Sequence, residues 1–215
     1  MFAEINYFES RSFSEVFDLL KIPNIKSCII AGGTDVLIGI RNNSSRFKEI
    51  NTIIDLKNIQ GISEITETET EVKIGSYATF SSIYNNQITN KYFPLLIKAV
   101  SQVGNLQVRN RATIGGNIVN CAPCADSVPP LLVYNANVVI RNSESIYKIP
   151  LSKFLVSPYK TILKNDEILE SIILPIPKQN YKGSFIKLGK RKGVAISRLT
   201  LAILIKQQDN ILTDI

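Results

Sequence analysis

The chain has 215 residues, of which 45% are hydrophobic and 20% are charged, a length and composition that allow one or two domains with a sizeable core. Its 25 lysines and arginines against 18 acidic residues give a net charge of +7, which suits an anionic ligand or partner but identifies neither. Histidine is absent, which excludes Ser-His-Asp and Cys-His catalysis and histidine-ligated zinc or haem.

The first part of the chain alternates predicted helices and strands. Ser12 and Glu15 form a capping box ahead of apolar residues at helical spacing, and Pro23 ends this segment. Residues 26–31, KSCIIA, predict a buried strand that runs into a glycine turn, after which VLIGI predicts a helix. Residues 51–56 predict another short strand. This alternation is typical of α/β or α+β proteins.

The later segments predict a hairpin, two helices and a long loop. Apolar and polar residues alternate across a Thr/Glu-rich turn in residues 61–80, as they do in a hairpin. Helical stretches follow at 79–86 and 93–103. The Gly/Asn/Pro-rich segment 109–130 is predicted as a loop, and its length indicates a functional role. Further strands are expected within residues 131–142, 167–177 and 199–205.

The sequence carries no visible targeting or membrane segment. Its opening residues, MFAEINYFES, lack the basic and apolar regions of a signal peptide. No apolar run approaches the roughly 20 residues that span a bilayer, and three cysteines are too few for a disulfide framework. We therefore expect a cytoplasmic protein with reduced thiols.

The segment AGGTD, Ala31 to Asp35, joins the strand predicted at residues 26–31 to the helix that follows it. Such a junction points backbone N–H groups outward at the positive end of the helix dipole, where phosphate binds well. Gly32 and Gly33 allow positive φ and close approach of a ligand to the main chain, and Thr34 adds a hydroxyl donor. An ordinary βα turn is the alternative interpretation. The spacing matches neither a Rossmann fingerprint nor a P-loop.

A second glycine pair lies in TIGGN, Thr113 to Asn117, and Asp126 follows in the same predicted loop. The glycines offer bare backbone to a ligand, while Asn117 and Asp126 supply side chains that can bond sugar hydroxyls. Two glycine turns flanked by hydroxyl residues suit a ligand with two anionic or polyol segments, for which a dinucleotide is the obvious candidate. A structured loop held by Asn and Asp turn bonds is the alternative.

Segments along the whole chain carry a resemblance to a known family. They read IIAGGTDVLIGIRNN, VRNRATIGGNIVN, ADSVPPLLVYNA, DEILESIILP and FIKLGKRKGVAISRL. Through them the chain resembles the FAD-binding subunit of the molybdenum hydroxylases, most closely the separate FAD subunit of bacterial xanthine dehydrogenases. The pairing of AGGTD with TIGGN is specific for this flavin domain, whereas either motif alone is a weak signal.

The resemblance implies an α+β fold of the molybdenum hydroxylase (PCMH) type. Residues 1–177 would form the FAD-binding domain, with subdomains of about 1–56 and 57–177 and the FAD in the cleft between them. Residues 178–215 would begin an α/β C-terminal domain. In the family this domain extends well beyond Ile215, so the chain is expected to be a truncated form or to end early.

The resemblance also assigns cofactor contacts by position. The backbone amides of Ile29 to Asp35 would wrap the FAD diphosphate, and Thr113 to Asn117 would hold the second half of the cofactor. Asp126 would accept hydrogen bonds from a sugar or ribityl hydroxyl, Leu169 would pack near the flavin rings, and Lys187 would lie at the cofactor site. The full expected set is Ile29, Ile30, Ala31, Gly32, Gly33, Thr34, Asp35, Thr113, Ile114, Gly115, Gly116, Asn117, Asp126, Leu169 and Lys187.

The resemblance implies an oxidoreductase subunit that transfers electrons. In the family a molybdenum-pterin large subunit oxidises the substrate, 2Fe-2S clusters in a small subunit carry the electrons to FAD, and NAD⁺ or another acceptor receives them. No catalytic residue is assigned to this chain, because the flavin performs the redox chemistry and the protein binds and orients it. Xanthine dehydrogenase activity, and with it a role in purine metabolism, is the expected assignment.

The cysteines are expected to bind no metal. Cys121 and Cys124 form a Cys-x-x-Cys pair, but two thiolates without a second pair or any histidine are too few for a zinc or iron–sulfur site. A thiol pair at the surface or beside the flavin is the favoured interpretation. Cys28 is expected in the core.

Three alternatives stay open at this point. The chain could be the FAD subunit of another molybdenum hydroxylase, of the carbon monoxide, nicotinate or aromatic-CoA type. It could be a scaffold that no longer binds FAD, an alternative motivated by the short C-terminal region. A nucleic-acid-binding module is motivated by the positive charge alone and lacks a basic stretch interleaved with aromatic residues.

Overall fold

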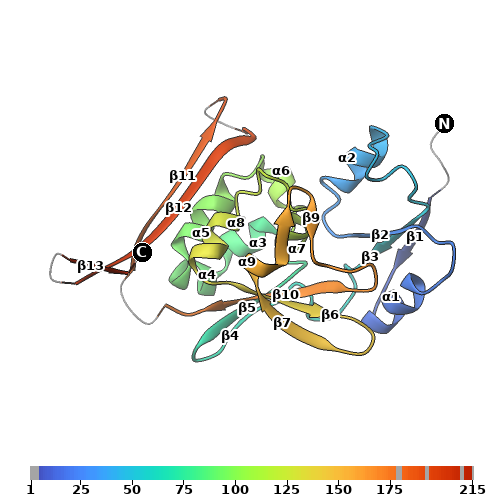
Figure 1. The fold of residues 1–215 in the computed structure, drawn as a ribbon, viewed down its shortest axis with the longest axis horizontal. Coiled ribbons are helices and arrows are strands. Elements are labelled where there is room, and N and C mark those ends of the chain that lie inside the picture. The colour runs from blue at the N-terminus through green and yellow to red at the C-terminus, as the bar shows by residue number, and fades with distance from the viewer. Residues whose placement is uncertain (1–4, 178–180, 192–193, 209–210, 215) are drawn as a thin grey trace.

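The computed structural model describes residues 5–177, 181–191, 194–208 and 211–214 (Figure 1). The chain is an α+β protein, as the resemblance predicts, with separate parallel and antiparallel sheets. Among the residues described, no helix is long and apolar enough to cross a membrane.

The N-terminal part is a small parallel sheet in the order β1-β3-β2. Its elements are β1 (Asn6–Glu9), α1 (Phe13–Leu20), β2 (Ser27–Ile30), α2 (Val36–Arg41) and β3 (Thr52–Asp55). The predicted cap of α1 is confirmed, because Ser12 Oγ accepts a hydrogen bond from the N–H of Glu15 at 3.2 Å. The predicted strand–turn–helix junction at AGGTD is confirmed as well. Strand β1 was not predicted from the sequence.

The central part is an antiparallel sheet in the order β4-β5-β10-β6-β7, with helices packed on one side (Figure 1). Its strands are β4 (Ile65–Glu67), β5 (Glu71–Gly75), β6 (Asn137–Arg141), β7 (Ile146–Pro150) and β10 (Ile168–Pro175). Its helices are α3 (Phe80–Asn85), α4 (Gln87–Tyr92), α5 (Pro94–Ser101), α6 (Leu106–Arg109), α7 (Ile114–Asn120), α8 (Val128–Val133) and α9 (Leu151–Phe154). The predicted hairpin corresponds to β4 and β5, and the main hydrophobic core lies between this sheet and the helices.

The prediction of a loop over residues 109–130 is wrong for its centre, which forms helix α7. Gly115 and Gly116 have low helix propensity, so the sequence pattern disfavoured a helix there. Tertiary contacts override this preference. The Thr113 hydroxyl caps the helix by accepting from the N–H of Gly116 at 3.0 Å, and Ile114 and Ile118 are buried in the core.

The C-terminal part is an antiparallel sheet of β11 (Tyr181–Gly189), β12 (Ser197–Gln208) and β13 (Ile211–Asp214). Figure 1 shows the β11–β12 hairpin alongside α5 and α8. Phe185 of β11 is buried in the main core, which fixes the hairpin to the helical layer. A short ribbon of β8 (Leu155–Ser157) and β9 (Lys160–Thr161) completes the fold. The division of the chain at about residues 56 and 177 stays a prediction.

Candidate functional site

The two glycine motifs line one cleft with a volume of about 540 Å³, within the usual size range of ligand sites. Its walls come from the β2–α2 turn, the start of α7, the strand β10 and the β11–β12 hairpin. Thirteen of the fifteen residues predicted from the resemblance line it. The other two, Ile30 and Ile114, are buried in the core.

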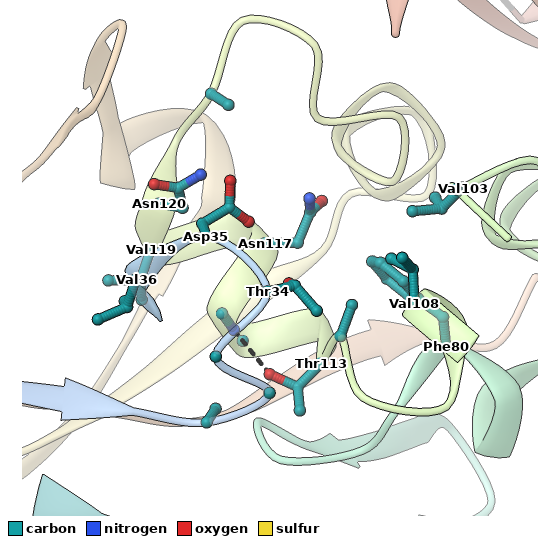
Figure 2. Close-up of a pocket in the computed structure, with 18 of the residues that line it drawn as sticks. Thr34, Asp35, Val36, Phe80, Val103, Val108, Thr113, Asn117, Val119 and Asn120 are labelled. Carbon is teal, nitrogen blue, oxygen red and sulfur yellow. Dashed lines mark hydrogen bonds between the residues drawn. The ribbon is translucent and has the colours of Figure 1, made fainter. Parts of the chain in front are cut away.

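The AGGTD turn presents unused backbone donors to the cleft. Gly33 has φ +71, a left-handed conformation that glycine adopts without strain. In the hydrogen bonds that link described residues, the N–H groups of Gly32, Gly33 and Thr34 are not donors. Asp35 begins α2 without capping it through its side chain. Figure 2 shows Thr34 and Asp35 in the same space as Asn117 of the second motif. This turn therefore keeps several N–H donors free for an anionic ligand.

Gly32 has a packing role that its sequence context did not predict. A Cβ atom at this position would overlap the backbone carbonyl oxygen of Arg111 and crowd Ala112. Gly115 stands in the same relation to Ser76. The missing side chain at Gly32 lets the AGGTD turn pack on the backbone just before TIGGN, and the one at Gly115 lets TIGGN pack on Ser76.

The second motif faces the first across a narrow gap. A Cβ on Gly116 would lie 3.0 Å from Thr113 Oγ1 and 4.0 Å from the Cβ of Ala31, which belongs to the first motif. Figure 2 marks the capping bond from Gly116 to Thr113. Asn117 Oδ1 accepts from the Ser127 hydroxyl at 2.7 Å. Among the described residues the Asn117 amide N–H₂ has no acceptor, so it too is available to a ligand.

Alanine substitutions at Gly32 and Gly116 compare a glycine packed on backbone with one packed on a side chain. We expect Gly32→Ala to lower the free energy of unfolding by about 1–3 kcal/mol, because backbone must move to admit the methyl group. Gly116→Ala should cost less stability, since its neighbour is a side chain, while narrowing the cleft. Chemical denaturation of the two variants checks this order. Equal free energies of unfolding for the two variants would contradict this expectation. They would show that the backbone near Gly32 can move to admit a methyl group at little cost.

Asp126 and Lys187 form a buried ion pair at the edge of the cleft. Lys187 Nζ donates to Asp126 Oδ2 at 2.5 Å and to the carbonyl oxygen of Gln102 at 2.9 Å, and the two side chains are 7% and 6% exposed. The other oxygen, Asp126 Oδ1, is buried and has no hydrogen-bond partner among the described residues. A buried carboxylate oxygen without a partner is costly. A ligand hydroxyl that donates to it would remove this cost.

Tyr77 connects the glycine turn to the first sheet, a link that no sequence motif indicated. Its hydroxyl donates to Asp55 Oδ1 at 3.0 Å and lies 3.2 Å from the carbonyl oxygen of Ala31. Burial, together with the hydrogen bond to Asp55, raises the pKa of Tyr77, so the hydroxyl stays protonated at neutral pH. Asp55 Oδ2 also accepts from the hydroxyl of Tyr7 at 2.6 Å. Asp55 thus fixes the ring that supports the turn.

The hydroxyls of Tyr77 and Tyr7 can be removed one at a time. The two variants distinguish the contact of Tyr77 with the glycine turn from the hydrogen bonds that both tyrosines make to Asp55. We expect Tyr77→Phe to cost about 1 kcal/mol of stability and to weaken ligand binding in the cleft several-fold, because Ala31 loses its contact. Tyr7→Phe is the control, since it removes a bond to the same Asp55 without touching the turn. Isothermal titration of both variants with the ligand proposed below tests this. A loss of equal size in Tyr7→Phe would assign the effect to Asp55.

The structure corrects one expectation about the cysteines. Cys28 lines the cleft and is only partly buried, whereas it was expected in the core. Burial raises the pKa of its thiol to about 11, so it is uncharged at neutral pH. Cys124 also lines the cleft, while Cys121 lies outside the lining and donates its S–H to the carbonyl oxygen of Ser157 at 3.3 Å. The described residues contain no group of three or more Cys, Asp or Glu side chains placed to hold a metal ion.

The family profile of the FAD-binding domain in molybdopterin dehydrogenases matches residues 3–177. The chain belongs to this family. The free amides of the AGGTD turn and the unpartnered Asp126 Oδ1 fit an FAD molecule, which offers a diphosphate to accept hydrogen bonds and hydroxyl groups to donate them. As a member of the family, the chain is the FAD-binding subunit of a molybdenum hydroxylase-type oxidoreductase.

Individual relatives differ in the reactions that their names state. The xanthine dehydrogenase FAD-binding subunit of Escherichia coli O157:H7 is 33% identical over 204 residues, which are 94% of this chain and 68% of the relative. The nicotinate dehydrogenase FAD-subunit of Eubacterium barkeri is 30% identical over 96% of this chain and 70% of the relative. A carbon monoxide dehydrogenase medium chain from Hydrogenophaga pseudoflava is 27% identical.

Solved structures show the same fold. A chain of the carbon monoxide dehydrogenase from Hydrogenophaga pseudoflava superposes with a TM-score of 0.93 at 24% identity, and covers 100% of this chain and 73% of its own. A chain of quinoline 2-oxidoreductase from Pseudomonas putida 86 has a TM-score of 0.89 at 24% identity. At this level of identity the likeness concerns the fold of the FAD-binding domain.

Proposed function

We propose that the chain is the FAD-carrying electron-transfer subunit of a xanthine dehydrogenase. In this proposal it stands between 2Fe-2S clusters in one partner subunit and NAD⁺ or another acceptor. The observation that carries the FAD site is the meeting of AGGTD and TIGGN in one cleft with unused hydrogen-bonding groups on both sides. The choice of xanthine rests on the 33% identity to the Escherichia coli subunit.

In this proposal different residues of the cleft would bind different parts of FAD. The N–H groups of Gly32 to Thr34 would bind the diphosphate, and the positive end of α2 would add to their attraction. Asp126 Oδ1 would accept from a sugar or ribityl hydroxyl. Leu169, which is 3% exposed on β10, would give the flavin rings an apolar contact that excludes water. The bound FAD would supply the redox chemistry.

The proposed assembly is a hetero-oligomer with a molybdenum-pterin large subunit and a 2Fe-2S small subunit. Its support is the naming of the relatives as FAD subunits or medium chains. The three cysteines of the chain form no disulfide in the structure, in keeping with the proposal of a cytoplasmic protein.

A second candidate is a nicotinate dehydrogenase subunit, which the 30% identity to the Eubacterium barkeri protein favours. The substrate is chosen at the molybdenum centre of these complexes, so the two candidates are separated by the complex and not by this chain. Reduction of the flavin in the purified complex by xanthine, and not by nicotinate, would support the first candidate. The opposite result would select the second.

Titration of the purified chain with FAD tests the site itself. We expect saturable binding of one FAD per chain, with quenching or a band shift of the flavin spectrum, and release of unmodified FAD by acid. The same titration with riboflavin measures how much of the affinity the diphosphate and adenosine supply. A properly folded chain that binds neither compound would favour the scaffold alternative.

Asp126 gives the sharpest test of a single side chain. We expect Asp126→Asn to weaken FAD binding by about 1–3 kcal/mol, because an amide accepts more weakly than a carboxylate. The same change leaves Lys187 without its charge partner and therefore also lowers stability.

The double variant Asp126→Asn/Lys187→Met separates these two effects. Removing the unpaired lysine charge should restore much of the stability while FAD binding stays weak. Full recovery of FAD affinity in the double variant, measured by the same titration, would limit Asp126 to its role as partner of Lys187.

A further inference from the structure

One cation that lines the cleft has no carboxylate within ion-pair distance among the residues that the structure describes. Four charged side chains line the cleft among the residues described, namely Asp35, Arg46, Asp126 and Lys187. Asp126 and Lys187 neutralise each other at 2.5 Å. In the described part of the chain no carboxylate lies within ion-pair distance of Arg46. Arg46 therefore brings a full positive charge to a site that must accept an anionic cofactor.

Uncharged groups hold the Arg46 guanidinium in place. Its Cζ lies 4.4 Å from the centroid of the Tyr159 ring and 5.1 Å from that of Phe47, distances typical of cation–π contacts. One Nη donates to Asn120 Oδ1 at 2.9 Å. Aromatic faces and an amide oxygen fix the plane of the guanidinium without cancelling its charge. The side chain is exposed, and in the bonds that link described residues only one of its nitrogens donates, so further N–H donors can reach a ligand.

Residues from three parts of the chain hold the two aromatic rings that contact Arg46. Gly39 in α2 leaves room for the Phe47 ring, because a Cβ at Gly39 would overlap it. Tyr159 adopts a left-handed backbone with φ +59. Its N–H donates at 2.8 Å to the carbonyl oxygen of Cys121, immediately after α7. The arginine thus connects the segment that follows AGGTD to the end of the helix that begins with TIGGN.

We propose that Arg46 binds the diphosphate of FAD and gives the cleft its preference for FAD over flavins without a diphosphate. The inference rests on the proposed FAD site and adds to it the residue that balances the cofactor's charge. The amides of the AGGTD turn carry only partial charges, while Asp35 adds a negative charge to the same lining. A guanidinium offers the phosphate oxygens charge-assisted, paired hydrogen bonds that an amide cannot match.

The test measures dissociation constants of FAD and riboflavin with the full chain and its variants. We expect Arg46→Met to weaken FAD binding at least about tenfold, the loss typical of a charge-assisted hydrogen bond, and to leave riboflavin binding unchanged. The FAD affinity of Arg46→Lys should lie between those of the unchanged chain and Arg46→Met, since lysine keeps the charge but cannot donate the paired hydrogen bonds of a guanidinium. Lys48→Met is the matched control for net charge, because Lys48 is exposed and does not line the cleft. It should bind FAD like the unchanged chain.

Asn120→Asp tests the unpaired charge with almost no change of shape. The new carboxylate would stand where the amide oxygen now accepts from Arg46, and would neutralise it. We expect FAD affinity to fall while riboflavin affinity and thermal stability stay the same. Raising the NaCl concentration should weaken FAD binding to the unchanged chain more than to Arg46→Met.

Each contrary result has a distinct meaning. Failure of the unchanged, folded chain to bind FAD overturns the proposed function. Normal FAD binding by Arg46→Met overturns only the role of Arg46. Equal losses for FAD and riboflavin also overturn it, because they assign the effect to the shape of the cleft. If Arg46→Met weakens NADH binding to the FAD-loaded chain and leaves FAD binding intact, the arginine serves the acceptor's diphosphate and the assignment to FAD is wrong.

Discussion

The contact of bare backbone at Gly32 is the constraint on which the cleft depends. Only a residue without a side chain lets the β2–α2 turn lie against the carbonyl of Arg111. This approach places Ala31 opposite Gly116 and within reach of the Tyr77 hydroxyl. The turn after β2 and the segment between α6 and α7 therefore meet backbone to backbone, and the cleft lies beside this contact.

The electrostatics of the cleft follow a second constraint, which is that a binding site must keep polar groups unsatisfied until its ligand arrives. Lys187 donates to one oxygen of Asp126, and the other oxygen has no partner in the described part of the chain. Arg46 rests on aromatic rings in place of a carboxylate. The buried, unpartnered oxygen of Asp126 costs stability in the protein without ligand, whereas the exposed guanidinium of Arg46 does not. The compensation comes from FAD, which couples binding of the cofactor to the free energy of folding.

Local sequence signals predicted the strand, turn and helix at AGGTD on one side of the cleft, but not helix α7 on the other side. The run KSCIIA, the glycine pair and VLIGI were enough to predict strand, turn and helix at AGGTD. Helix α7 was missed because its glycines argue against a helix. The Thr113 cap and the packing of Gly115 on Ser76, which decide in its favour, are known only from the fold. Strand β1 was missed since its four residues are exposed and carry little apolar pattern.

The resemblance brought Asp126 and Lys187 to the same site, but neither it nor the local sequence predicted their ion pair, which joins residues 61 positions apart. Tyr77 and Arg46 were missed for the same reason, because their roles depend on partners from other elements. The hairpin that carries Lys187 also has a consequence for biosynthesis. Residues 194–197 line the cleft, so a nascent chain cannot complete the site before Ser197 has left the ribosome. Under the proposed function, FAD would therefore meet a complete cleft only after the β11–β12 hairpin has been translated.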